Sequence, residues 1–215
     1  MTTPTQTYST SSRPQALHPA LIAALFALSV LTGLALARAG FAVADYLTAP
    51  PPLHGAVVAP AYPALGFTLT DQTGQYCDLR NLEGRAVLLT FGTVADGVNT
   101  LLPVLVEARD LLGDDAARVQ ILFITLDPAH DSPELLGEYA AIFGCSVLAL
   151  TGRPADVTTL ANNYNVTVSR PASGGVQHSL SVALIDPTGQ LRTFYTPGIT
   201  AHEIATDLRT VLAGH

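Results

Sequence analysis

The sequence predicts an α/β fold preceded by one apolar N-terminal helix. Short apolar runs of strand length alternate with longer segments of helical pattern along most of the chain. The composition, 48 % hydrophobic and only 13 % charged, suits a domain with a proper core together with one membrane span. Near the N-terminus, residues 19–37 form an uninterrupted run of uncharged, mostly apolar residues.

This apolar run predicts a transmembrane anchor over residues 18–38. Its 19 residues span about 28 Å as a helix, close to the hydrocarbon thickness of a bilayer. A cleaved signal peptide is the alternative, because residues 35–37 form an A-x-A-like cleavage site. The run is longer than the usual signal-peptide core, and only Arg13 precedes it, which favours the anchor. We expect residues 1–17 to form a disordered tail.

The charges beside the run favour a cytoplasmic N-terminus and a domain on the extracytoplasmic, periplasmic side. Arg13 precedes the span and Arg38 follows it, so the free amino terminus and Asp45 decide the orientation. Residues 39–63 come next and include a proline-rich stretch, which favours an extended chain without helix. We expect them to form a stalk that carries a domain over residues 64–215.

The charge of the chain beyond the anchor argues against a nucleic-acid partner. All ten basic residues are Arg, and eight of them lie, with all 17 acids, at or after Asp45, which gives that part a formal net charge of −9. An acidic domain repels nucleic acid and anionic lipid surfaces, whereas a basic protein face would attract it. Solubility alone accounts for the same charge.

The elements of the domain follow from three kinds of pattern. Alternation of apolar and polar residues around Gly-containing turns predicts hairpins, and short continuous apolar runs predict strands buried on both faces. Helices are expected after capping residues such as Asn99 and the Thr200–Glu203 capping box. The expected elements are strands over 67–71, 75–79 and 85–91, a helix over 100–112, a strand over 119–126, a helix opening at 131–134, a strand over 147–150, a helix over 154–163, strands over 179–185 and 191–195, and a helix from 200 to about 212. Strands alternating with helices, closed by a hairpin and a helix, indicate a thioredoxin-like domain.

Several motifs in this order resemble the SCO/SenC family, the membrane-anchored copper chaperones of cytochrome oxidase assembly. They keep the family spacing from about residue 64 to 212, and the anchor and stalk match as well. The motif DPxxDSPE followed by HS and LIDPTG is more specific than a general thioredoxin-like pattern. The matching pieces are 67–74 (FTLTDQTG), 82–92 (LEGRAVLLTFG), 124–140 (ITLDPAHDSPELLGEYA), 150–152 (LTG), 162–166 (NNYNV), 178–191 (HSLSVALIDPTGQL) and the terminal helix.

The resemblance implies a copper site from which this sequence departs. The family uses a Cys-x-x-x-Cys motif just after the Phe-Gly that ends the first buried strand, and a later His that matches His178. Counted from residues 91–92, the two cysteine positions are Asp96 and Thr100, and no Cys occurs between residues 78 and 144. Because Cu(I) prefers sulfur ligands, we expect no cofactor and no firm metal ligand. His178 is expected to hydrogen-bond within the fold, with copper binding there as the alternative.

We expect no enzyme activity and no catalytic residue. Cys77 and Cys145 match no zinc or CxxC spacing, so two buried small residues are the preferred interpretation, while a disulfide or a thiol oxidoreductase site is the alternative. Asp127 and Asp131 resemble paired catalytic carboxylates, but turn and capping roles before a helix explain them.

The retained scaffold and the altered ligands predict a non-catalytic accessory subunit or assembly factor of a respiratory or photosynthetic electron-transfer complex. The resemblance implies cytochrome oxidase, or a quinol-oxidising assembly such as alternative complex III, and therefore integral membrane subunits as partners. The bilayer is a further partner, through residues 19–37. An active copper chaperone with an altered site at His178, and a thiol oxidoreductase using Cys77 and Cys145, are the alternatives.

Overall fold

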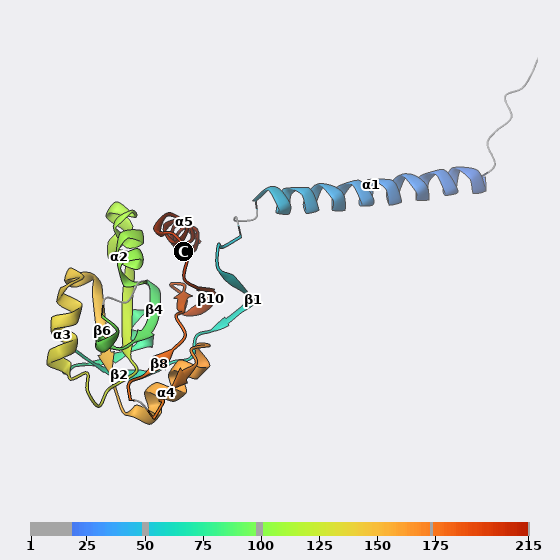
Figure 1. Cartoon of the computed structure of the whole chain (residues 1–215). Helices are drawn as coiled ribbons and strands as arrows, with labels where there is room; N and C mark the ends of the chain where they lie inside the picture. The colour runs from blue at the N-terminus through green and yellow to red at the C-terminus, as the bar shows by residue number, and fades with distance from the viewer. Residues whose placement is uncertain (1–18, 49–51, 98–100, 173, 215) are drawn as a thin grey trace, which may run out of the picture. The chain divides into compact units, whose positions relative to one another are not determined.

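The computed structural model describes residues 19–48, 52–97, 101–172 and 174–214, and the chain divides into two compact units between Pro50 and Pro51 (Figure 1). The first unit contains helix α1, Pro19–Thr48. Within the described ranges, no helix has the combination of length and apolar character that a membrane crossing requires. The transmembrane prediction for residues 18–38 is therefore not confirmed, and the tail predicted over 1–17 lies outside the described residues.

The second unit is built on an eight-stranded mixed sheet, which confirms the predicted α/β class (Figure 1). The strand order is β1-β10-β9-β4-β5-β6-β2-β3, in which β4, β5 and β6 run parallel and the other neighbouring pairs run antiparallel. A short two-stranded ladder joins β7 and β8. The strands are β1 Ala56–Pro63, β2 Thr68–Asp71, β3 Tyr76–Asp78, β4 Ala86–Gly92, β5 Val119–Thr125, β6 Val147–Thr151, β7 Val168–Ser169, β8 Gln177–His178, β9 Val182–Ile185 and β10 Gln190–Tyr195; the helices are α2 Leu102–Asp110, α3 Pro133–Ala141, α4 Pro154–Asn163 and α5 Ala201–Ala213.

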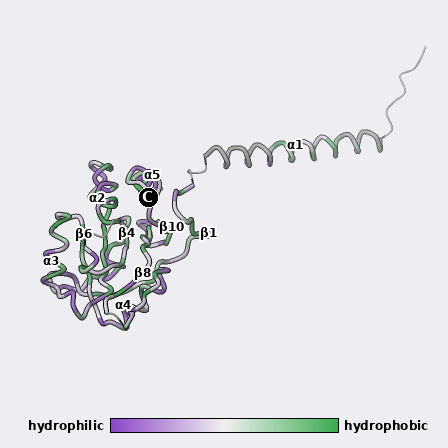
Figure 2. Tube along the Cα trace, viewed as in Figure 1, coloured by the Kyte–Doolittle hydropathy of each residue, from purple (hydrophilic) through white to green (hydrophobic). Residues whose placement is uncertain are grey.

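The central strands separate two hydrophobic cores, as their period of two requires. All seven residues of β4 are buried, and Leu88 belongs to the core shared with α2, α3 and α5, whereas Leu89 belongs to the core shared with α4. The continuous apolar runs therefore reflect burial on both faces. The helices that cover the sheet contain both hydrophobic and hydrophilic residues, as expected of helices with one buried face and one exposed face (Figure 2).

The segment predicted to be a stalk differs from that expectation. Residues 39–48 continue α1, and Ala56–Pro63 form the outer strand β1, which pairs with β10. Proline lacks an N–H donor but fits an edge strand, so a proline-rich extended chain is compatible with this position. Gly55 brings the chain onto the sheet, because a Cβ there would lie 2.5 Å from the carbonyl oxygen of Phe194. The compact unit thus begins at Pro51 rather than at residue 64.

The remaining elements agree with the sequence patterns in type, with boundaries that differ by a few residues. Thr200 and Glu203 form the predicted capping box at the start of α5. Ser132 caps α3, with Pro133 in its first turn. The cap predicted at Asn99 lies outside the described residues. The sequence patterns did not predict the short ladder of β7 and β8, which is two residues long on each side.

Candidate functional site

The candidate site lies in the loop between β4 and α2, the position at which the resemblance places the first copper ligand. The loop leaves the carboxyl end of a central parallel strand, where α/β folds commonly place their sites. Its first turn, Val94–Asp96, is a short 3₁₀ helix that begins with a capping box. The Thr93 N–H donates to Asp96 Oδ2 at 3.0 Å, and the Asp96 N–H donates to Thr93 Oγ1 at 3.2 Å. These bonds fix the Asp96 carboxylate on its own turn.

Helix α3 and the chain that leads into it hold the loop from a second side. Asp131 is buried, accepts a hydrogen bond from the Val94 N–H at 3.2 Å, and also accepts one from the Thr125 hydroxyl. The Tyr139 hydroxyl donates to the Gly97 carbonyl at 3.2 Å. Asp131 therefore acts as a connector between β5, the loop and α3, which supports a structural role for this carboxylate.

His178 reaches the loop from the β7–β8 ladder. Its backbone pairs with Val168, and its side chain is only 7 % exposed. The ring nitrogen Nε2 lies 2.9 Å from Asp96 Oδ2, and Nδ1 lies 3.1 Å from the Ser179 carbonyl oxygen. The structure thus brings together His178 and Asp96, which are 82 positions apart in the chain.

Both nitrogens of the His178 ring face acceptors. A carboxylate and a carbonyl oxygen accept hydrogen bonds only, so a ring nitrogen that bonds either of them does so as an N–H donor. A metal ion needs instead the lone pair of an unprotonated ring nitrogen. In this arrangement, copper would have to displace Asp96 or the Ser179 carbonyl to reach His178.

The Asp96 carboxyl is held in its ionised form. Partial burial opposes ionisation, but hydrogen bonds from His178 and Thr93, with the charge of His178, outweigh it and lower the pKa of Asp96 below its ordinary value. The pair is therefore a histidine–carboxylate contact at the place where the resemblance puts a thiolate and a metal-bound imidazole.

These residues do not fit a Cu(I) site. Among the residues that the structure describes, no three His, Cys, Asp or Glu side chains come close enough together to share a metal ion. Asp96 offers a hard oxygen, while Cu(I) selects thiolate and thioether ligands. Thr100, the second cysteine position, lies outside the described residues and carries a hydroxyl, which is also a hard oxygen donor.

The nearest described thiol belongs to a different part of the sheet. Cys77 is a buried free cysteine on the edge strand β3, whereas the loop with Asp96 follows β4, four strand positions away. At the usual spacing of about 4.8 Å between strands, this separation is roughly 19 Å. Burial, with the negative charges of Asp71 and Asp78, raises the pKa of the Cys77 thiol, which disfavours the reactive thiolate. The side chain of Cys145 lies outside the described residues.

The other histidines that the structure describes, His54, His130 and His202, lie outside this site. His130 pairs with Asp127 at 2.8 Å on an exposed loop, and His202 is exposed in the first turn of α5. The Asp127 backbone N–H donates to the Thr125 hydroxyl oxygen at 3.0 Å, which agrees with the turn role inferred from the sequence.

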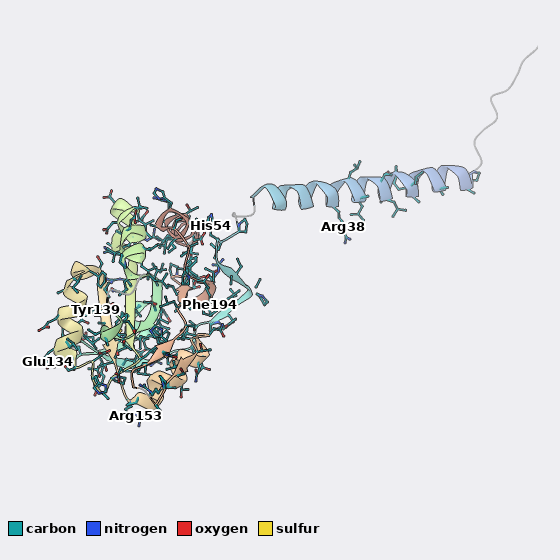
Figure 3. All side chains as sticks on the ribbon, viewed as in Figure 1. Arg38, His54, Glu134, Tyr139, Arg153 and Phe194 are labelled. Carbon is teal, nitrogen blue, oxygen red and sulfur yellow. The ribbon has the colours of Figure 1, made fainter. Side chains whose placement is uncertain are left out.

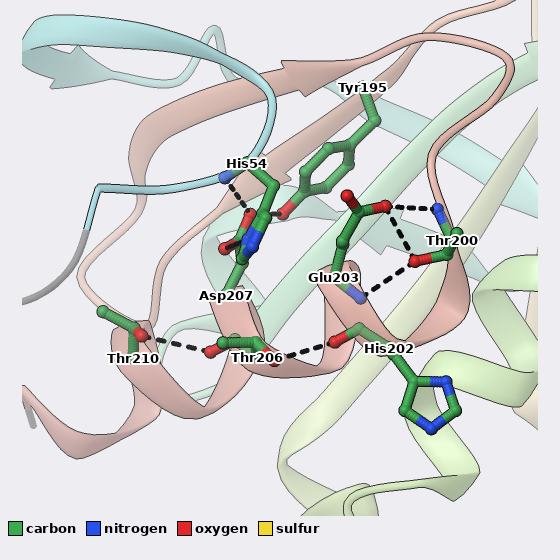
Figure 4. A network of polar contacts seen from close by, with 8 residues as sticks. All are labelled: His54, Tyr195, Thr200, His202, Glu203, Thr206, Asp207 and Thr210. Carbon is green, nitrogen blue, oxygen red and sulfur yellow. Dashed lines mark hydrogen bonds and ion pairs between the residues drawn. The ribbon is translucent and has the colours of Figure 1, made fainter.

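A second polar network, centred on Asp207 of α5, was missed by the sequence patterns (Figure 4). Asp207 is only 1 % exposed and accepts hydrogen bonds from the His54 N–H at 2.9 Å, from His54 Nδ1 at 2.7 Å and from the Tyr195 hydroxyl at 2.9 Å. The hydrogen bond to Asp207, opposed by desolvation and aided by the charges of Asp207 and Glu203, raises the pKa of His54. Burial and the same carboxylate raise the pKa of Tyr195, which remains a donor. The network attaches the chain before β1 to the domain.

A family model described as SCO1/SenC matches residues 61–213 of this chain. An SCO2-like protein from Rickettsia felis is 33 % identical over 144 residues, which cover 64 % of this chain and 73 % of that protein. The mitochondrial protein SCO2 of Saccharomyces cerevisiae is 34 % identical over 141 residues, covering 59 % of this chain and 46 % of the yeast protein.

The fold is also shared with solved structures. The copper-bound structure of ScoI from Bradyrhizobium japonicum matches with a TM-score of 0.61 and 25 % identity, over 70 % of this chain and all of that chain. The similarity confirms the thioredoxin-like Sco fold of the second unit.

Proposed function

Because this chain belongs to the SCO1/SenC family, we propose that it is a non-catalytic accessory subunit or assembly factor of a membrane-bound electron-transfer complex. The complex is cytochrome oxidase, or a quinol-oxidising assembly such as alternative complex III, of a respiratory or photosynthetic chain. The single observation that carries this proposal is the contact of 2.9 Å between His178 and Asp96. In this contact an internal histidine–carboxylate hydrogen bond stands in place of soft metal ligands, while the scaffold around it is retained.

The surroundings of this pair support a structural use of the site. Thr93, Asp131 and Tyr139 fix the loop through hydrogen bonds within the domain. The part of the loop that the structure describes, residues 93–97, is held in one arrangement by these bonds, which suits docking to other subunits. Neither copper transfer nor thiol exchange is part of the proposal, because both need sulfur ligands that the site does not offer.

Attachment to a membrane is also part of the proposal. The uncharged run over residues 19–37 supports it, and the flanking charges support a cytoplasmic N-terminus with the domain in the periplasm. Integral membrane subunits of the complex are then the partners, since they share the same bilayer.

Co-purification tests the docking role. The tagged full chain, expressed in its source cells and extracted in mild detergent, is expected to bring haem-containing subunits of one complex with it. Recovery of the chain alone, with no haem absorbance and no stoichiometric partner, would contradict the proposal.

Copper loading tests the alternative of an active chaperone. After anaerobic incubation with Cu(I) and desalting, the full chain is expected to retain far less than one copper per molecule, with the same value for His178→Ala. Stoichiometric copper that is lost in His178→Ala would overturn the non-catalytic assignment in favour of an altered chaperone site.

A further inference from the structure

A shallow apolar groove lies between α2 and the end of α3, away from the site described above. Its volume is about 780 Å³. Its apolar lining consists of Pro103, Val106, Leu111, Ile142 and Phe143, and two carboxylates, Glu107 and Asp110, complete it. The groove therefore combines an apolar floor with negative charge at its rim.

The apolar residues of the groove lie outside the fully buried core, although Val106, Leu111 and Phe143 pack against it with part of their surface. Helix α2 buries Leu102, Leu105 and Ala108 in the core, so its contribution to the groove is a second, outward stripe at positions 103, 106, 107 and 110. Ile142, just beyond α3, is 64 % exposed. An outward apolar stripe next to an exposed branched side chain is typical of an interaction surface rather than of a solvated face.

The negative charges at the groove lie near the C-terminal end of α2, where the helix dipole favours positive charge. Asp110 is the last residue of α2, and the negative end of a helix dipole favours cations over a carboxylate. Arg109 pairs with Asp110 at 3.6 Å, and Arg209 donates to the Leu111 carbonyl at this end of the helix. Glu107 adds a further negative charge one turn earlier. The Asp110 side chain is 64 % exposed, so Glu107 and Asp110 are open to a cation supplied from outside.

We propose that this groove binds a basic amphipathic helix of a partner protein. Apolar side chains of that helix pack on Val106 and Ile142, and its Lys or Arg side chains pair with Glu107 and Asp110. The stretch from Pro103 to Leu111 is about 12 Å long at 1.5 Å per residue, which matches two turns of a docked helix with anchors at i, i+3 or i+4, and i+7. An anionic lipid surface is disfavoured as the occupant, because it would be repelled by the same carboxylates.

This inference deepens the proposed function, since it names the surface through which the accessory subunit would contact its complex. The probe is a labelled 16-residue peptide with Leu at every third or fourth position and Lys elsewhere, titrated against the full chain in zwitterionic detergent. A peptide with Glu in place of Lys is its control. Fluorescence anisotropy is expected to show binding of the Lys peptide only, weakened as salt rises.

Two double variants locate the binding surface. Val106→Asp with Ile142→Asp, and Glu107→Gln with Asp110→Asn, are each expected to weaken binding about tenfold or more, the second with a smaller salt dependence. Glu83→Gln with Glu134→Gln makes the same change in net charge elsewhere and is expected to leave the affinity unchanged. Glu134, labelled in Figure 3, lies in the first turn of α3 and does not line the groove. Unchanged far-UV circular dichroism establishes that each variant is folded.

Equal binding of the Lys and Glu peptides would overturn the inference. So would an equal effect on affinity of the Glu107→Gln, Asp110→Asn variant and its control, Glu83→Gln, Glu134→Gln. A further result would also overturn it: the full chain binds anionic vesicles, the groove variants no longer bind the vesicles, and the same variants still bind the Lys peptide. In source cells, the Val106→Asp, Ile142→Asp variant is expected to lose the haem subunits that the wild type retains. If both retain them, the groove inference fails and the proposed function stands; if the wild type brings none, the proposed function fails, and the peptide titration alone decides the groove.

Discussion

Replacement of Tyr195 by Phe tests the network that attaches the start of the second unit to α5. The Tyr195 ring is 1 % exposed and its hydroxyl donates to the buried Asp207 carboxylate at 2.9 Å. Phe keeps the ring volume, so no cavity forms and the change removes one hydrogen bond to a charged group. Such bonds contribute about 1.5–3 kcal/mol. Because both His54 donors remain on Asp207, we expect a loss of about 2 kcal/mol in the free energy of unfolding.

The assay is denaturant unfolding of the full chain, followed by far-UV circular dichroism because the sequence contains no Trp. The expected loss corresponds to a decrease in Tm of about 4–8 °C for a unit of this size. Tyr76→Phe is the matched control, since Tyr76 is 81 % exposed, and it is expected to leave the free energy of unfolding unchanged. A Tyr195→Phe protein that unfolds together with this control, at an equal m-value, would refute the reasoning.

Three further predictions address the same segment and the altered site. The pair of His54 and Asp207 contributes stability that is fully present below pH about 6.5 and is lost as pH rises through the raised pKa of His54. The difference in Tm between wild type and His54→Gln is therefore expected to shrink from pH 6 to pH 9. A difference that stays constant over this range would contradict the reasoning. Gly55→Ala is expected to cost about 1–3 kcal/mol in denaturant unfolding, because its Cβ would overlap the Phe194 carbonyl and the Thr193 hydroxyl, whereas Gly66→Ala, with nothing within 4 Å of its Cβ, serves as the unaffected control. Asp96→Cys with Thr100→Cys is expected to raise copper retained after Cu(I) loading to about one per chain, measured by elemental analysis, and the matched Ser pair is expected to retain none; equal copper in both would show that other residues exclude the metal.

Much of the sheet could be predicted from the sequence because its central strands are buried on both faces. The continuous apolar runs that contain Leu88 and Phe123 are buried most completely as central strands, covered on both faces of the sheet. The start of the unit could not be predicted in this way. Proline in residues 48–63 indicates extended chain, but only the pairing with β10 distinguishes an edge strand from a free stalk.

The candidate site could be predicted in part. Counting from the end of β4 placed Asp96 and His178 at equivalent positions of one site, and the structure brings them into contact. Their role as mutual partners depends on the acceptors around the ring, such as the Ser179 carbonyl, which carry no sequence signal. The contact between His54 and Asp207 joins residues 153 positions apart, and neither belongs to a recognisable motif.

The outer position of β1 has a consequence for how copies of this chain behave when crowded. A free strand edge is a template for adding another strand, and so for aggregation. Pro60 and Pro63 remove two donors from this edge, which interrupts the row of hydrogen bonds that a neighbour would need. The same short strand that ties the leading chain to the domain thereby offers a neighbouring copy only an interrupted row of donors at this edge of the sheet.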